Sequence, residues 1–202
     1  MSDSELTPSK LALRRTVQAQ RSRRTADEQA ALARRLTAVA LELPRLRAAT
    51  CVALYASMSD EPDTVLLRHE LRRRGTRVLL PVIADATTLD WAEDDGRLAT
   101  AAVVNSVRSI AEPSGPRLGP EGLGAADVVI VPAQAVDTSG TRLGRGRGYY
   151  DRALAHAARG ALVAALIHDD ELLDATTTPV AREAHDHPVQ AVITPTRWLY
   201  LQ

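Results

Sequence analysis

A segment rich in glycine and arginine, residues 140–151, carries the side chains best suited to chemistry in this sequence. It reads Gly-Thr-Arg-Leu-Gly-Arg-Gly-Arg-Gly-Tyr-Tyr-Asp. Glycine lets the backbone approach a ligand closely, and arginine presents planar, permanently charged donors that match phosphate oxygens. Asp151 is the kind of oxygen ligand that Mg²⁺ takes beside a nucleotide. The segment predicts a phosphate-binding loop with a metal ligand attached; a flexible turn between a strand and a helix is the alternative.

The glycine spacing separates this loop from two common phosphate-binding motifs. No Gly-Lys-[Ser/Thr] follows the glycines, as it would in a Walker A loop, and Gly144-x-Gly146-x-Gly148 differs from Gly-x-Gly-x-x-Gly. A helix that begins near Tyr149 would add free N–H groups and its dipole to an anion site.

Four other residues are candidates for the same chemistry. Lys10 is the only lysine of the chain, and Arg14, four positions on, shares its helical face. Asp186 offers a second carboxylate for a metal, and Glu61 follows a predicted strand. Each has a structural alternative without chemistry. Lys10 and Arg14 could belong to a solvated helix face, and Asp186 to a polar His-Asp-His loop. Glu61 could be a first-turn acid beside a proline. The sequence contains no Ser-His-Asp order, nucleophile elbow or Cys-His pair.

Composition bounds the class of protein. The chain has 202 residues, zero formal net charge and one cysteine, Cys51. Zero net charge gives no reason to expect nucleic acid or an anionic membrane as partner, and a lone cysteine fits a reducing compartment. No apolar run reaches membrane-spanning length. We therefore expect a cytoplasmic protein that acts on small molecules.

Apolar strands alternate with amphipathic helices along the chain. Strands are predicted at 51–55, 77–81, 89–91, 127–132, 161–167 and 191–194, and helices at 7–22, 25–43, 62–75 and 149–159. This alternation predicts an α/β fold with three layers, a largely parallel sheet flanked by helices, and an N-terminal helical pair. Ligands of such sheets lie at the carboxyl ends of the strands. The polar segments 57–61, 134–150 and 168–170 are therefore expected to converge on one cleft.

Together these residues resemble the 5-formyltetrahydrofolate cyclo-ligase family, also called methenyltetrahydrofolate synthetases. The segment 140–152 is similar to that family's signature almost residue for residue, with Arg147 where glycine or lysine is more usual. Further elements resemble the family in the same order: residues 10–14, 55–61, 110–113, 131–132 and 184–194.

The resemblance implies an ATP- and Mg²⁺-dependent cyclisation of 5-formyltetrahydrofolate to 5,10-methenyltetrahydrofolate. It also implies one domain over residues 1–202, of the type shared with certain sugar-phosphate isomerases and CoA transferases, with residues 1–45 as helices packed on the core. A monomer is expected.

The resemblance also assigns roles to individual positions. The implied nucleotide-binding residues are Lys10, Arg14, Arg142, Leu143, Gly144, Arg145, Gly146, Arg147, Gly148, Tyr149 and Tyr150. Arg145 and Lys10 are the implied catalytic pair, and Asp151 and Asp186 the implied Mg²⁺ ligands. Glu61, Tyr149 and Tyr55 would bind the folate.

The sequence departs from the family in one respect. Residues 107–109 lack an aromatic that family members often place there, so pterin stacking falls to Tyr149, Tyr55 or Trp91.

Two other functions stay open. One is a nucleotide- or folate-binding regulator without turnover, which would tolerate the missing aromatic. The other is a phosphosugar or CoA-ester enzyme of the same fold, which would need a catalytic acid, for which Glu61 and Glu112 are the candidates.

Overall fold

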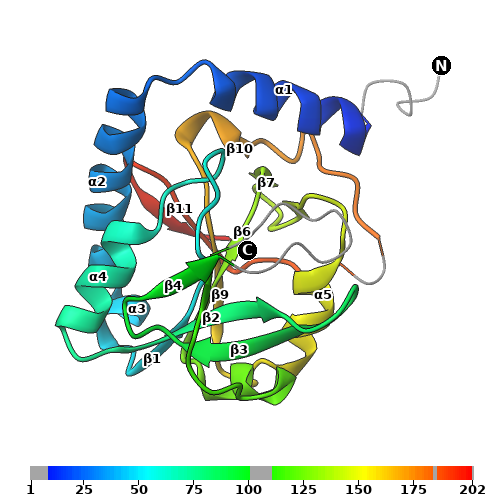
Figure 1. Cartoon of the computed structure of the whole chain (residues 1–202). Coiled ribbons are helices and arrows are strands. Elements are labelled where there is room, and N and C mark those ends of the chain that lie inside the picture. The colour runs from blue at the N-terminus through cyan, green and yellow to red at the C-terminus, as the bar shows by residue number, and fades with distance from the viewer. Residues whose placement is uncertain (1–8, 101–110, 184–185, 202) are drawn as a thin grey trace.

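A largely parallel sheet of seven strands forms the centre of the computed structural model, which describes residues 9–100, 111–183 and 186–201 (Figure 1). Its strands run in the order β12-β11-β9-β6-β1-β2-β3. The parallel strands are β1 (Cys51–Ala53), β2 (Arg77–Ile83), β6 (Val128–Pro132), β9 (Leu162–Leu166) and β11 (Ala191–Ile193). The edges are the antiparallel strands β3 (Leu89–Glu93) and β12 (Trp198–Tyr200).

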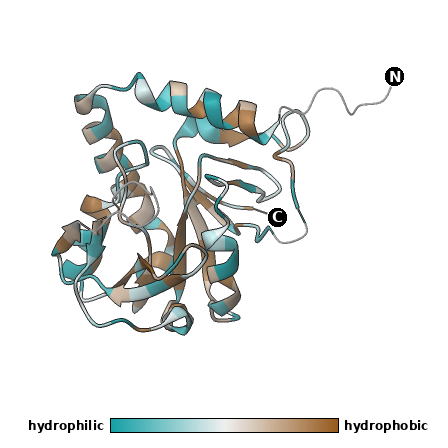
Figure 2. Cartoon of the chain, turned by 45° about the vertical axis from the view of Figure 1, so that its right-hand side comes forward, coloured by the Kyte–Doolittle hydropathy of each residue, from teal (hydrophilic) through white to brown (hydrophobic). Residues whose placement is uncertain are grey.

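Both faces of the sheet are buried, which explains why its central strands read as unbroken apolar runs. Side chains alternate between the faces along β1: Val52 belongs to one hydrophobic cluster, and Cys51 and Ala53 to another. Figure 2 shows these apolar strands running through the middle of the molecule. The expected α/β class with a largely parallel sheet is confirmed.

Helices cover one face through α2 (Ala26–Glu42), α3 (Pro44–Ala48) and α4 (Val65–Arg73). The other face is covered by α5 (Tyr149–Ala153) and the 3₁₀ turns η2 (Pro120–Ala125) and η3 (Leu154–His156). Two small sheets complete the fold: β10 (Leu172–Leu173), β7 (Ala135–Asp137) and β8 (Arg142–Leu143) form one, and β4 (Leu98–Thr100) and β5 (Ala111–Pro113) the other. The turn η4 (Asp169–Glu171) follows β9.

Capping residues fix the two N-terminal helices. Ser9 accepts a hydrogen bond from the backbone of Ala12 at the start of α1 (Lys10–Ser22), and Thr25 forms a capping box with Glu28 at the start of α2. Proline at the first position of α3 separates it from α2. In Figure 1, α1 lies across the top of the molecule, above the ends of the strands where the candidate site is found.

Two helix boundaries predicted from the sequence are wrong. The helix expected from Pro62 begins at Val65, because Asp63 and Thr64 form a turn in which Asp63 Oδ1 accepts the N–H of Val65. The helix expected over 149–159 ends at Ala153 and continues only as a 3₁₀ turn to His156, since the chain must turn at residues 157–161 to enter β9.

Candidate active site

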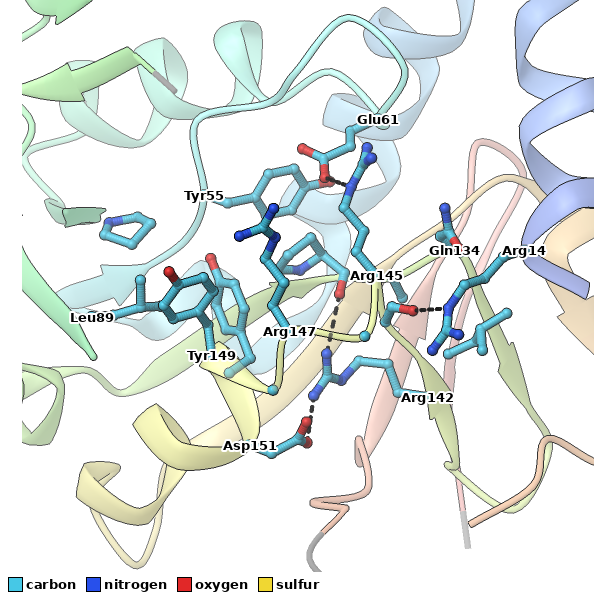
Figure 3. Close-up of a pocket in the computed structure, with 18 of the residues that line it drawn as sticks. Arg14, Tyr55, Glu61, Leu89, Gln134, Arg142, Arg145, Arg147, Tyr149 and Asp151 are labelled. Carbon is cyan, nitrogen blue, oxygen red and sulfur yellow. Dashed lines mark hydrogen bonds and ion pairs between the residues drawn. The ribbon is translucent and has the colours of Figure 1, made fainter. Parts of the chain in front are cut away.

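A cavity of about 720 Å³ opens where β1 and β6 end. Its walls are α1, the turn after β1, the segment after β6, and the glycine-rich loop that leads into α5 (Figure 3). β1 and β6 are neighbours in the sheet although distant in sequence, so their carboxyl ends present these segments side by side. The cavity also has a separate wall from residues 183 and 186, which lie before β11.

All residues to which the family resemblance assigned a nucleotide, metal or folate role by position line this cavity. They are Lys10, Arg14, Tyr55, Glu61, Arg142, Leu143, Gly144, Arg145, Gly146, Arg147, Gly148, Tyr149, Tyr150, Asp151 and Asp186. Of the three polar segments expected to converge, 57–61 and 134–150 do so. The convergence predicted for residues 168–170 is wrong, because that turn packs under α1 through Arg24 and Arg21 instead of lining the cavity.

Two glycines shape the loop. Gly140 has φ +85°, and a Cβ there would lie 2.5 Å from the carbonyl oxygen of Val189. Gly146 has φ +89°, and a Cβ there would come within 3.3 Å of the Arg14 guanidinium. Side chains at these positions would be strained and would push the loop away from the segment before β11 and from α1. The loop is thereby held with its backbone against a cationic wall.

Arginines tie the loop to its surroundings. Arg14 Nε donates to the carbonyl of Gly144 at 2.9 Å. Arg142 is largely buried and pairs with Asp151, with 2.7 Å between Nη2 and Oδ1. Arg145 crosses the cavity to the turn after β1: its Nε lies 3.0 Å from Glu61 Oε1 (Figure 3).

Arg145 holds a second carboxylate in the same turn, which sequence reasoning missed. Its Nη2 lies 2.7 Å from Asp60 Oδ1. Glu61 is fixed independently, because its Oε2 accepts the N–H of Met58 at 3.0 Å. The guanidinium of Arg145 is therefore held by two acids on the wall opposite its own loop.

Lys10 meets acids of the segment before β11. Its Nζ lies 2.8 Å from Glu183 and 3.2 Å from Asp186. The hydrogen bond to Glu183 raises the pKa of Lys10, and Asp186 adds to this, while partial burial opposes it. Lys10 therefore presents a positive charge at the cavity.

The two predicted metal ligands come from different elements: Asp151 lies in α5, and Asp186 in the segment before β11. Asp151 Oδ1 accepts the N–H of His187, next to Asp186 in the chain, at 3.3 Å. Among the described residues, no cluster of three or more acidic, histidine or cysteine side chains is placed to hold a metal. Mg²⁺ needs no such cage, since it commonly takes one or two carboxylates and completes its shell with phosphate and water oxygens. The donor set present fits a magnesium ion that arrives with a nucleotide.

Aromatic and apolar side chains form the other end of the cavity. The Tyr149 hydroxyl donates to the carbonyl of Asp85, and the Arg152 guanidinium lies 5.7 Å from the centre of its ring. Tyr55 is buried with its hydroxyl donating to the carbonyl of Pro62, and burial raises its pKa. Leu89 lies beside Tyr149 in Figure 3. Trp91 is fully buried in the core and does not line the cavity, so the suggestion that it stacks on a ligand is wrong.

A buried ion pair under the cavity was also missed. Arg21 donates to both carboxylate oxygens of Glu171 at 2.7 Å, and to the carbonyls of Asp60 and Ala133. Arg21 is 4% exposed and Glu171 0%. The sequence could have indicated that Arg21 lies near the site, because it follows Arg14 by seven residues and so shares its helical face. Nothing in the sequence pointed to Glu171.

Other sequence-based candidates fall outside this geometry. Glu112 accepts the N–H of Ile83 and does not line the cavity. Ala184, His185 and residues 107–110 lie outside the described residues. No helix among the described residues is long and apolar enough to cross a bilayer.

His168 makes folding stability depend on pH. Burial lowers its pKa from 6.5 to about 4. Because the folded state then binds fewer protons than the unfolded state between these values, stability is complete above pH 6.5 and falls as the pH drops toward 4. The loss attributable to this group reaches about 3 kcal/mol. Urea unfolding of the wild type and of His168→Gln at pH 7 and pH 4.5 measures it; equal pH dependence in both proteins would contradict it.

Three comparisons place the chain among known proteins. Residues 6–195 match the model of the 5-formyltetrahydrofolate cyclo-ligase family. A 5-formyltetrahydrofolate cyclo-ligase from Mycolicibacterium smegmatis is 43% identical over 147 residues, which are 72% of this chain and 74% of the relative. The enzyme of that name from Escherichia coli K12 is 30% identical over 86% of this chain and 93% of its own.

Solved structures agree with the sequence relatives. The fold is similar to an Aquifex aeolicus 5,10-methenyltetrahydrofolate synthetase, with a TM-score of 0.76, 26% identity, and coverage of 96% of this chain and 93% of that one. A 5,10-methenyltetrahydrofolate synthetase from Mycoplasma pneumoniae aligns with a TM-score of 0.69 and 18% identity, over 92% of this chain and 98% of that one, which is a likeness of fold.

Proposed function

This chain belongs to the 5-formyltetrahydrofolate cyclo-ligase family, and we propose that MgATP drives the family's reaction in the cavity of Figure 3. That reaction closes 5-formyltetrahydrofolate to 5,10-methenyltetrahydrofolate. The observation that carries the proposal is the meeting of the glycine-rich loop with Lys10, Arg14 and Glu61 in one cavity. The loop and the basic side chains suit a triphosphate, and the aromatic end suits a pterin.

The chemistry explains why a nucleotide is needed. Ring closure expels the formyl oxygen, which is a poor leaving group as hydroxide. In the proposed sequence the formyl oxygen attacks the γ-phosphorus of ATP and ADP leaves. N10 then attacks the activated carbon and loses its proton, and the phosphorylated oxygen departs as inorganic phosphate. Phosphoryl transfer of this kind depends on positioning and on neutralising charge, and no protein nucleophile is required.

Arg145 and Lys10 are the proposed catalytic residues, because both bring positive charge to the cavity from different elements. The triphosphate would lie along the loop, whose residues 144–148 line the cavity together with Arg14 and Arg142. Leu143, Tyr149 and Tyr150 would complete the nucleotide contact. A triphosphate in this position would compete with Asp60 and Glu61 for the Arg145 guanidinium. It would draw that side chain away from the two carboxylates.

The folate would occupy the aromatic end. Glu61 would accept hydrogen bonds from the donor edge of the pterin, since its carboxylate has lone pairs beyond those used by Met58 and Arg145. Tyr149 and Tyr55 would contact the ring. In this arrangement the formyl group would lie between Glu61 and the loop, on the side of the terminal phosphate.

Asp151 and Asp186 would hold Mg²⁺, which supplies charge neutralisation on the phosphate oxygens when bound. In the unliganded chain Arg142 neutralises Asp151, and Lys10 contacts Asp186. These ion pairs tie both carboxylates to the wall of the cavity.

Asp151→Asn is expected to raise the Mg²⁺ concentration required for half-maximal activity by about tenfold or more, because the amide oxygen is a weaker ligand than a carboxylate. Initial rates measured against free Mg²⁺ at saturating ATP provide the test. Asp174→Asn, in an exposed turn, is the matched control. An Mg²⁺ dependence identical to that of the wild type would remove Asp151 from the metal site.

A direct assay tests the proposed function. Purified protein is mixed with 5-formyltetrahydrofolate and MgATP, and the absorbance of methenyltetrahydrofolate is followed. Product is expected only with all components present, together with one ADP and one phosphate per turnover. Folded protein that binds nucleotide and folate without product would support the alternative, a regulatory protein of the same fold.

We further propose that the chain acts as one domain of the sugar-phosphate isomerase/CoA transferase-like type, with residues 9–45 packed on its core. Residues 1–8, which the prediction from the sequence included, lie outside the described residues. A monomeric, cytoplasmic enzyme with small-molecule substrates, and neither nucleic acid nor membrane as partner, agrees with the zero net charge of the chain.

A further inference from the structure

Gln134 places an unused hydrogen-bond acceptor at the cavity. The residue is 5% exposed and lines the cavity immediately after β6. Its side-chain oxygen Oε1 is buried and has no hydrogen-bond partner among the described residues. Buried polar atoms are nearly always satisfied, so an orphan at a ligand cavity indicates an interaction that the ligand completes.

Backbone contacts fix the backbone of Gln134 at the cavity. The N–H of Gln134 donates to the carbonyl of Leu143 at 2.8 Å, and the carbonyl of the preceding residue, Ala133, accepts from the buried Arg21. Gln134 is thus held between the glycine-rich loop and α1.

With the amide oriented as in the structure, Oε1 needs a hydrogen-bond donor as its partner. Phosphate oxygens only accept hydrogen bonds, so they do not satisfy Oε1 in this orientation. Figure 3 shows Gln134 beside Arg14, on the far side of Arg145 from Tyr149 and Leu89. A triphosphate whose terminal group reaches toward the aromatic end would leave its nucleoside near Gln134. The nucleoside carries donors of two kinds: the exocyclic amine of the base and the hydroxyls of the ribose.

We propose that Gln134 accepts a hydrogen bond from the nucleoside part of the nucleotide and thereby contributes to the choice of nucleotide. This inference rests on the proposed function, since it takes ATP as the ligand of the loop. A base amine as donor would favour adenine over a 6-oxopurine; a ribose hydroxyl as donor would favour ribonucleotides over 2′-deoxynucleotides.

Gln134→Met tests the proposal, because methionine keeps the length of the side chain and removes its hydrogen-bonding groups. The affinity for a non-hydrolysable ATP analogue, measured by calorimetry without folate, is expected to fall about tenfold. The affinity for inorganic tripolyphosphate is expected to stay that of the wild type. If Gln134 had only a structural role, Gln134→Met would lower the affinity for both ligands or lower the melting temperature. Removing an orphaned buried acceptor leaves the melting temperature of the free protein unchanged or raises it.

The matched control is Thr37→Val, which removes another buried and unpartnered polar atom from α2, away from the cavity. It is expected to bind both ligands as the wild type does. Reaction rates with two ATP analogues then show which group is the donor. ITP lacks the amine of the base, and 2′-deoxy-ATP lacks a ribose hydroxyl. Gln134→Met should abolish the wild type's preference for ATP over one of them.

Three outcomes would overturn the inference: equal loss of tripolyphosphate and ATP-analogue affinity, unchanged affinity for both, or a raised KM for the folate alone. A wild-type protein that binds no nucleotide at all would instead overturn the proposed function, and the inference would fall with it. A wild type that binds the ATP analogue, with Gln134→Met equal to it, refutes the inference alone.

Discussion

Arg145→Ala is expected to lower kcat/KM for the cyclisation by about 10²–10³-fold while the protein stays folded. The arginine brings a delocalised positive charge and forked donors to a cavity in which charge must be neutralised during phosphoryl transfer. Its side chain is about one-third exposed, so its removal costs little packing. Glu61, which is largely buried, keeps its hydrogen bond from the N–H of Met58. The loss should therefore appear in catalysis.

Steady-state kinetics with both substrates varied, together with circular dichroism, would measure this effect. Arg145→Lys keeps the charge and loses the fork, so we expect it to fall between alanine and the wild type. The control is Arg73→Ala, an exposed helix residue paired with Glu70, for which wild-type rates are expected. A loss below fivefold for Arg145→Ala would remove this residue from the reacting centre.

Glu171→Leu is expected to lower the free energy of unfolding by about 3–5 kcal/mol, the largest effect on stability that the structure indicates. The substitution leaves the Arg21 guanidinium buried without its counter-charge, although the carbonyls of Asp60 and Ala133 still accept from it. For a chain of this size the melting temperature should fall by roughly 10 °C.

The double variant Arg21→Met/Glu171→Leu should recover part of this loss, because it removes the uncompensated charge along with its partner. Urea unfolding of both variants and the wild type provides the comparison. Glu93→Leu breaks the exposed pair with Arg77 and is expected to change stability by less than about 1 kcal/mol. If Glu171→Leu cost no more than Glu93→Leu, the ion pair would not be a stabilising feature of the fold.

The sequence predicts the parts of the site that depend on local pattern. Lys10 and Arg14 were placed on one helical face by their spacing, and both line the cavity. The loop was recognised because glycine and arginine together suit phosphate. The parallel sheet followed from apolar runs that are buried on both faces. Each of these conclusions needed only neighbouring residues and the rule that strand ends gather ligands.

Features that depend on distant contacts were not predictable in the same way. Arg21 looks like any helix-surface arginine until Glu171 is brought beneath it by the turn after β9. Asp60 became part of the site only because Arg145 reaches across the cavity. Gln134 looks like an ordinary polar loop residue, and its orphaned oxygen follows from tertiary packing alone. Helix ends were misplaced where short turns compete with apolar periodicity, as at Val65 and Ala153.

The pairing of β1 with β6 sets a condition on how this chain can fold. Val52 lies opposite Val128, so β1, an internal strand of the sheet, must wait for a neighbour from the second half of the chain. Contacts of such long range slow folding, since loop entropy is lost before they form. During synthesis, the first half of the chain would leave the ribosome with one edge of β1 unpaired. Chaperone shielding of that edge would protect the nascent chain until β6 and the loop behind it arrive.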